Sequence, residues 1–152
     1  LTHTLHYGTG VFEGIRAYET PEGPAVFRLT EHMERLVNSA KIMAMPMPYT
    51  VDELVAATKA VVAASGLPSC YIRPIAYYGY GEMGLATTNC TVDVSIACWL
   101  FALNCENTPC TKSRRKILSI RLANRTTCSK KNCCNNSESC KPIWQAFKET
   151  DH

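Results

Sequence analysis

The stretch HYGTGVFEGIRAY, residues 6–18, mixes strand-forming residues with residues that a plain β-strand does not favour. Residues 11–18 carry the β-branched and aromatic side chains typical of a strand. Glu13 and Arg16 nevertheless stand inside it, and Gly14 lies between them where a packed strand would carry a larger apolar side chain. The stretch therefore predicts a strand that also contributes to a functional site.

Turn and helix signals follow this strand along the chain. A turn at residues 19–23 contains Pro and Gly and predicts a β-hairpin. Thr30 is expected to cap a first helix, and Thr50 and Glu53 form a capping box that begins a second. The predicted elements are, in chain order, strands at 11–18 and 24–29, helices at 30–44 and 51–66, and strands at 70–78 and 91–101.

The order of these elements, β-β-α-α-β-β, is typical of the α+β class, here an antiparallel sheet with two helices packed on it. The chain has 152 residues, of which 46% are hydrophobic and 19% charged, so it can bury a core and is not disordered. It contains no apolar run of membrane-span length and no signal-peptide pattern, so we expect a cytoplasmic protein that does not enter a membrane. Because it begins without Met, we expect a piece cut at its front.

Composition divides the chain into a body at residues 1–99 and a tail at residues 100–152. The body carries 6 Lys and Arg against 9 Asp and Glu, whereas the tail carries 10 against 4. Six of the 9 cysteines lie in the tail, and all 8 glycines lie in the body. We expect the body to be one small domain and the tail to be a diverged, basic, cysteine-rich segment.

Several polar and aromatic side chains of the body stand on predicted strands or at the edge of an apolar helix face. They are Tyr7, Glu13, Arg16, Arg35, Tyr71 and Arg73. One interpretation is structural, with Glu13 in an internal ion pair with Arg16 or Arg73. The other is functional, because arginines beside tyrosines suit a small anionic ligand. The residue types alone leave both interpretations open.

Four ordered motifs resemble the N-terminal part of the branched-chain amino-acid aminotransferases, which are fold-type IV enzymes that use pyridoxal 5'-phosphate. The resemblance covers residues 3–99, and its motifs are residues 6–18, 27–36, 71–74, and 81–85 with 92–94. It implies the N-terminal small domain of that fold, and a tail that covers the interdomain loop and the start of the cofactor domain. The implied reaction moves an amino group between leucine, isoleucine or valine and 2-oxoglutarate.

The resemblance also implies roles for individual residues. Arg35 matches the arginine that binds the cofactor phosphate. The residues that match the substrate-binding pocket are Tyr7, Phe12, Gly14, Arg16, Tyr71 and Arg73. In that pocket Gly14 would leave room for a branched side chain beside Phe12, and the Tyr and Arg groups would accept the carboxylate of glutamate.

The resemblance requires a catalytic lysine that carries the cofactor, and Lys131 is the preferred candidate because its distance from Tyr71 and the following Asn135 fit the family pattern. Lys130 and Lys141 are alternatives. The family's second domain should follow the tail, so we expect this piece to be inactive or nearly so. The parent enzyme is expected to be a homodimer acting on amino-acid and 2-oxo-acid substrates.

Two further interpretations stay open. One is another fold-type IV enzyme, such as a D-amino-acid transaminase or an aminodeoxychorismate lyase. The other is a non-catalytic remnant with a metal-binding tail, although the tail cysteines fit no strong zinc spacing and we expect no metal.

The basic run at residues 114–116 has no interleaved aromatics, so we expect a solvated face and no nucleic acid. A sequence error or shifted reading frame near residue 100 would also explain the altered composition.

Overall fold

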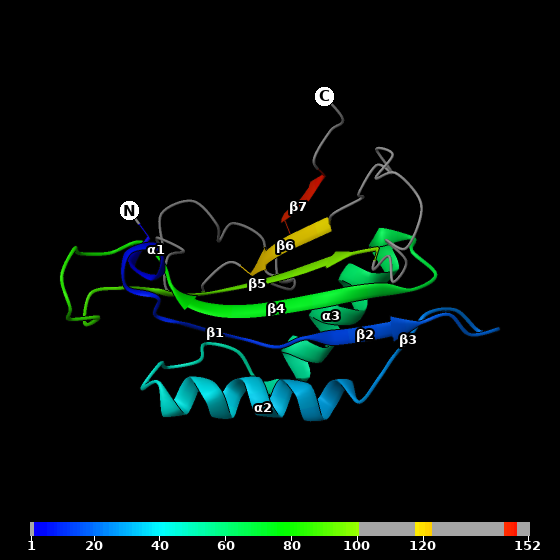
Figure 1. Ribbon diagram of the computed structural model, residues 1–152, viewed down its shortest axis with the longest axis horizontal. Coiled ribbons are helices and arrows are strands. Elements are labelled where there is room, and N and C mark those ends of the chain that lie inside the picture. Colours follow the sequence, from blue (N-terminus) through cyan, green and yellow to red (C-terminus); the bar gives the residue numbers. More distant parts are fainter. Residues whose placement is uncertain (1, 101–117, 123–144, 149–152) are drawn as a thin grey trace, which may run out of the picture.

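The computed structural model describes residues 2–100, 118–122 and 145–148, and the structural statements below concern these residues. An antiparallel sheet runs through the molecule, and the two long helices lie together against one of its faces (Figure 1). The elements are α1 (His3–Tyr7), β1 (Gly10–Phe12), β2 (Ile15–Tyr18), β3 (Ala25–Val26), α2 (Leu29–Ile42), α3 (Val51–Ser65), β4 (Cys70–Tyr78), β5 (Val92–Trp99), β6 (Leu118–Leu122) and β7 (Gln145–Lys148). This confirms the α+β class.

Strand β4 is the centre of the sheet. The strand order is β3-β2-β4-β5-β6-β7, with β1 also paired to β4. Residues of β4 alternate strictly between a buried face and a half-buried face. Ile72 points into the core, whereas Tyr71 and Arg73 lie on the half-buried face, which we call the open face. The alternation expected for residues 70–78 is therefore confirmed.

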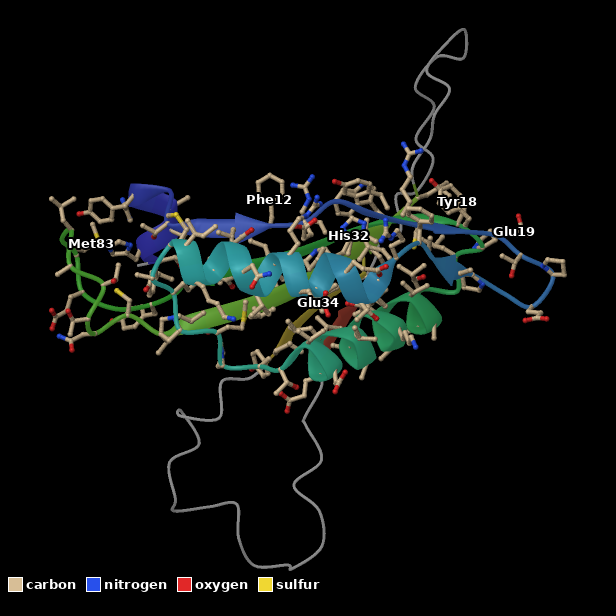
Figure 2. All side chains as sticks on the ribbon, turned by 90° about the horizontal axis from the view of Figure 1, so that it is seen from below. Phe12, Tyr18, Glu19, His32, Glu34 and Met83 are labelled. Carbon is tan, nitrogen blue, oxygen red and sulfur yellow. The ribbon has the colours of Figure 1, made fainter. Side chains whose placement is uncertain are left out.

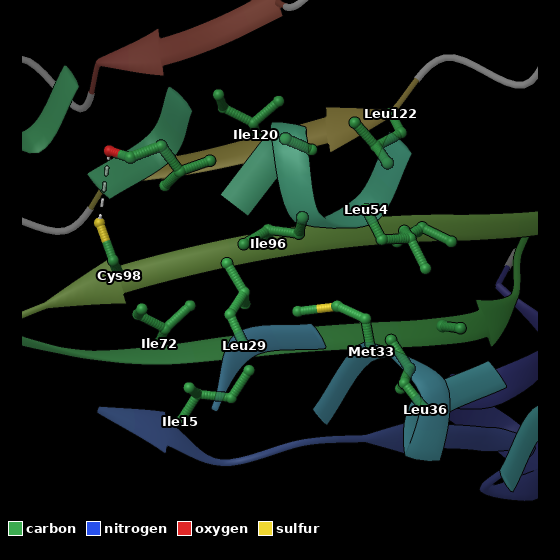
Figure 3. Close-up of a cluster of buried hydrophobic side chains, with 14 of the residues drawn as sticks. Ile15, Leu29, Met33, Leu36, Leu54, Ile72, Ile96, Cys98, Ile120 and Leu122 are labelled. Carbon is green, nitrogen blue, oxygen red and sulfur yellow. Dashed lines mark hydrogen bonds between the residues drawn. The ribbon is translucent and has the colours of Figure 1, made fainter. Parts of the chain in front are cut away.

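The core fills the space between the sheet and the helices (Figure 3). It contains Met33 and Leu36 from α2, Leu54 from α3, and Ile72 and Ile96 from the central strands, each with no exposed surface. Burying such side chains stabilises the fold by about 1.5–3 kcal/mol each. The helices are thereby fixed on one face, and the open face is left for other contacts.

The second helix confirms its local signals. The Thr50 side chain accepts a hydrogen bond from the backbone N–H of Glu53, and the Glu53 carboxylate accepts one from the backbone N–H of Thr50. This is the predicted capping box. Gly66 ends α3 in the left-handed region, with φ of 63°, where glycine is favoured.

Three details of the prediction were wrong at the first strands and helix. The strand expected at residues 11–18 is interrupted between β1 and β2. The backbone N–H of Glu13 donates to the Pro74 carbonyl, but Pro74 has no N–H, so the second hydrogen bond of this residue pair cannot form. The strand expected at residues 24–29 shrinks to Ala25–Val26. Arg28, not Thr30, is the N-cap residue, because Arg28 takes a left-handed conformation and α2 begins at Leu29.

Other differences lie near the ends of the described chain. The strand expected at residues 91–101 is observed at Val92–Trp99, and α1, β6 and β7 were not predicted. Within the described residues, none of the helices combines the length and the apolar character needed to cross a membrane.

Candidate functional site

Five candidate residues lie together on or beside the open face of the sheet. Register places Arg16 opposite Tyr71, and Tyr71 in turn opposite Trp99. Phe12 lies opposite Ile75, two residues from Arg73 on the same face of β4. Gly14 lies next to Tyr71, because a Cβ built on Gly14 would lie 2.5 Å from the Tyr71 hydroxyl oxygen. The structure therefore brings Phe12, Gly14, Arg16, Tyr71 and Arg73 together, and their role as a substrate pocket, which the resemblance implies, stays a prediction.

Arg73 is the centre of this group. Its Nη2 donates a 2.7 Å hydrogen bond to the Tyr71 hydroxyl. Its guanidinium also lies over the Phe12 ring, 4.4 Å from the ring centroid, in a cation–π arrangement. Two aromatic side chains thus hold the arginine on the open face.

Within the described part of the chain, one polar atom of Arg73 lacks a hydrogen-bond partner. Its Nε is buried and has no hydrogen-bond partner among the described residues. A buried donor without an acceptor costs about 1–3 kcal/mol, and a charged donor costs more. Because the guanidinium lies on the open face, it can donate to an incoming carboxylate, so the geometry suits an anionic ligand.

The open face also offers apolar surface. The rings of Tyr71 and Trp99 lie with centroids 4.9 Å apart. Phe12 is 59% exposed, so most of its ring is free to contact a ligand. Trp99 was missed as a site residue, although strict alternation from the buried Cys98 would have placed it on this face.

A second cluster lies across the sheet, between the β1–β2 junction and α2. The buried Glu13 carboxylate accepts from Arg35 through Nε at 2.7 Å and through Nη2 at 2.5 Å. Its Oε2 also lies 3.1 Å from Nδ1 of His32. Glu13 is therefore paired with Arg35, and not with Arg16 or Arg73, the two partners that the structural interpretation had named. The reason is that Arg16 and Arg73 lie on the open face, opposite to the side that Glu13 occupies.

The surroundings of Glu13 keep it ionised. Burial alone would raise the pKa of the Glu13 carboxyl, but the hydrogen bonds from Arg35 and His32 outweigh it, and the pKa lies below its ordinary value of 4.5. The same contact raises the pKa of the Arg35 guanidinium. His32 was missed by the sequence analysis, although its position one helical turn before Arg35 places both on the same face of α2.

Tyr7 lies away from the other candidates. It belongs to α1, which lies at the opposite end of the sheet from β2 (Figure 1). The Tyr7 ring instead contacts His3, with centroids 4.5 Å apart. Its predicted place in the pocket is thus not formed by contacts within the described chain and stays a prediction.

Other candidates and features fall elsewhere. Lys131, Lys130 and Lys141, the cysteine-rich part of the tail and the basic run at 114–116 lie outside the described residues. A cavity of about 530 Å³ lies between the β2–β3 turn and the end of α3, and its lining includes Val26, Lys59 and Val62 but none of the candidate residues.

Comparison with known proteins defines the class. Residues 10–135 match the family described as Amino-transferase class IV. Because this match spans most of the chain, the chain belongs to the class IV amino-transferase family.

The particular relatives are branched-chain enzymes. A curated relative from Pseudomonas aeruginosa, named branched-chain-amino-acid aminotransferase, is 56% identical over 99 residues, which is 65% of this chain and 32% of that protein. The crystal structure of the Escherichia coli branched-chain amino acid aminotransferase superposes with a TM-score of 0.63 and 46% identity, covering 66% of this chain and 34% of that one. The branched-chain aminotransferase from Thermoproteus uzoniensis, solved with norvaline, superposes with a TM-score of 0.63 and 45% identity, at 66% and 34% coverage. The chain thus spans about a third of the length of these relatives.

Proposed function

We propose that this chain is the N-terminal portion of a branched-chain amino-acid aminotransferase, which exchanges the amino group of leucine, isoleucine or valine with 2-oxoglutarate by means of pyridoxal 5'-phosphate. The observation that carries the proposal is Arg73, whose buried Nε has no partner in the described chain, held between Phe12 and Tyr71. The names of the relatives support the same interpretation.

The open face can accept two kinds of side chain. Phe12, Tyr71 and Trp99 present ring surface against which a branched aliphatic side chain loses contact with water. Arg73 can donate to the second carboxylate of glutamate or 2-oxoglutarate when that substrate occupies the same place. One pocket can therefore serve both halves of the reaction.

The residues present also fit the cofactor. Arg35 uses Nε and Nη2 toward Glu13, which leaves both N–H donors of Nη1 for a phosphate, and its side chain is 65% exposed. When bound, pyridoxal 5'-phosphate supplies a ring that accepts the electron pair released at the substrate Cα. Lys131 is proposed to carry the cofactor and to move the proton at that carbon, with Lys130 and Lys141 as alternatives.

The parent enzyme is proposed to be a cytoplasmic homodimer. Large apolar side chains are exposed on the described surface, among them Leu5 at 81%, Leu85 at 88% and Tyr80 at 70%. Such surface suits burial against the remainder of the enzyme or a second copy.

Borohydride reduction in the presence of pyridoxal 5'-phosphate, followed by peptide mapping, tests the proposal on this chain. We expect a pyridoxyl label on Lys131, and its loss in the Lys131→Arg variant. A label on Lys130 or Lys141 would move the lysine but keep the class of reaction. Uniform low labelling of all lysines would contradict a cofactor site in this chain.

A further inference from the structure

Glu13 connects the open face of the sheet to α2. Its neighbours Phe12 and Gly14 face the open side, whereas its own side chain points the other way and is 4% exposed. Its backbone N–H donates to the Pro74 carbonyl at 3.0 Å, which ties it to the central strand. In Figure 2, seen from the helix side, Phe12 extends outward past β1, while His32 of α2 lies near the β1–β2 junction. A rigid, buried carboxylate is thus presented to α2.

The contact with Arg35 fixes the orientation of its guanidinium. Both oxygens of Glu13 accept from Arg35, one from Nε and the other from Nη2. Two parallel hydrogen bonds of this kind define the plane of an arginine head group. Without them, an arginine side chain that is 65% exposed would sample many rotamers, and binding an anion would require ordering it first.

The donors that remain on Arg35 are directed away from Glu13. The fork uses Nε and one N–H of Nη2, so both donors of Nη1 stay on the outer edge of the guanidinium. A phosphate can bind this outer edge without displacing Glu13. The carboxylate and the anion would then occupy opposite sides of one arginine.

We infer that Glu13 is a positioning residue, which holds Arg35 ready for the phosphate end of the cofactor. The inference rests on the proposed function, because that proposal assigns Arg35 to the phosphate. It makes a prediction opposite in sign to that of simple electrostatics. If Glu13 were only a nearby negative charge, then its removal would strengthen the binding of an anion. If Glu13 positions Arg35, then its removal weakens that binding.

The experiment compares pyridoxal 5'-phosphate with pyridoxal, which lacks the phosphate. Each ligand is added at increasing concentrations, the amount of borohydride-trapped label gives its affinity, and the ratio of the two affinities is the preference for the phosphorylated form. In the wild-type chain we expect a clear preference for the phosphorylated form. The Glu13→Gln variant should reduce this preference about tenfold, because a single amide oxygen cannot accept both bonds from Arg35. Its affinity for pyridoxal should not change.

The control is a second Glu–Arg pair at the start of α2. Glu31 accepts from Nε of Arg28 at 2.9 Å, and both side chains are exposed. The Glu31→Gln variant removes an equal charge from the same helix and leaves the Glu13–Arg35 contact intact, so its preference should not fall below that of the wild type.

A second variant covers a failure of Glu13→Gln to fold, which circular dichroism would show. Arg35→Lys keeps the charge of an exposed side chain but cannot form the fork with Glu13. The Arg35→Lys variant should lose most of the preference for the phosphorylated form. The double variant with Arg35→Lys and Glu13→Gln, where it folds, should lose little more. Retention of the wild-type preference by Arg35→Lys would overturn the inference.

The remaining outcomes separate the two proposals. An increased preference in Glu13→Gln, or an equal loss of both affinities, would overturn the positioning role while Arg35 keeps its assignment. If Arg35→Gln leaves the wild-type preference unchanged, then the assignment of Arg35 to the phosphate fails, and the role of Glu13 fails with it.

Discussion

A side chain at position 14 would occupy the space of the Tyr71 hydroxyl, because a Cβ built on Gly14 would lie 2.5 Å from that oxygen. The hydroxyl is the one that accepts from Arg73 at 2.7 Å. Gly14 therefore has a structural role that is separate from the room it is proposed to leave for a ligand. It allows Tyr71 to stand where it can orient the arginine.

The Gly14→Ala variant should displace the Tyr71 hydroxyl from Arg73. We expect the free energy of unfolding to fall by only about 1 kcal/mol, since the atom that must shift is at the end of a side chain. The affinity for 2-oxoglutarate should fall further, by about tenfold, because Arg73 loses its orienting contact. Denaturant melts and a binding titration would measure the two effects.

The matched control removes the Tyr71 hydroxyl, which is the group that a side chain at position 14 would meet. In a Tyr71→Phe background the hydroxyl is absent, so Gly14→Ala should add almost no further loss of binding. Equal effects of Gly14→Ala in both backgrounds would show that Gly14 acts through some other contact.

Arg73 should distinguish a dicarboxylate from an aliphatic oxo acid. The Arg73→Gln variant should bind 2-oxoglutarate about tenfold more weakly, because a charge-assisted hydrogen bond is lost. Binding of 4-methyl-2-oxopentanoate, whose side chain is apolar, should change by less than about threefold. The fluorescence of Trp99, whose ring lies 4.9 Å from that of Tyr71, provides the readout in a Trp144→Phe background. Equal losses for both ligands would argue against this role.

Part of the fold follows from short-range signals. The capping box of Thr50 and Glu53 and the alternation of residues 70–78 depend on neighbouring residues only, and both are confirmed. The interruption after Phe12 depends on Pro74, more than sixty residues away, whose missing N–H leaves the ladder incomplete. The local pattern of residues 11–18 could not include that effect.

The candidate site shows the same division. The alternation of strand residues places Tyr71 and Arg73 on one face, so their proximity could be predicted from the sequence. Alternation also separates Glu13 from Arg16, and applying it would have excluded their pairing. Pairing with Arg35 depends instead on how α2 packs against the β1–β2 junction, which residue spacing does not determine.

Acid should remove the stabilising contribution of Glu13. Its pKa in the folded chain lies below 4.5, so the contribution is fully present above the unfolded-state pKa and is lost as the pH falls through the folded-state pKa. At pH 7 the free energy of unfolding of the Glu13→Gln variant should be about 1–2 kcal/mol lower than that of the wild type. This difference should shrink below pH 4.5, as followed by denaturant melts between about pH 7 and pH 3.

Glu34 provides the control for that series. It lies on α2 one residue before Arg35 and is exposed (Figure 2). The Glu34→Gln variant should follow the wild-type curve at every pH. A constant difference between the wild type and Glu13→Gln across the series would mean that the ionised carboxylate is not what stabilises the fold.

The cysteines of the body should differ in reactivity. Cys70 and Cys98 lie in the core with 2% and 0% of their surface exposed, and the Cys98 thiol donates to the Val61 carbonyl (Figure 3). A hydrogen bond with Cys98, together with burial, raises the pKa of Cys70. Alkylation of the native chain at pH 8 should therefore modify the half-buried Cys90 at least about 100-fold faster than either core thiol, since the latter must wait for the structure to open. Peptide mapping separates these sites from the tail cysteines, and urea should abolish the difference. Equal rates for Cys90 and Cys98 in the folded chain would contradict the packing of β5 against α3.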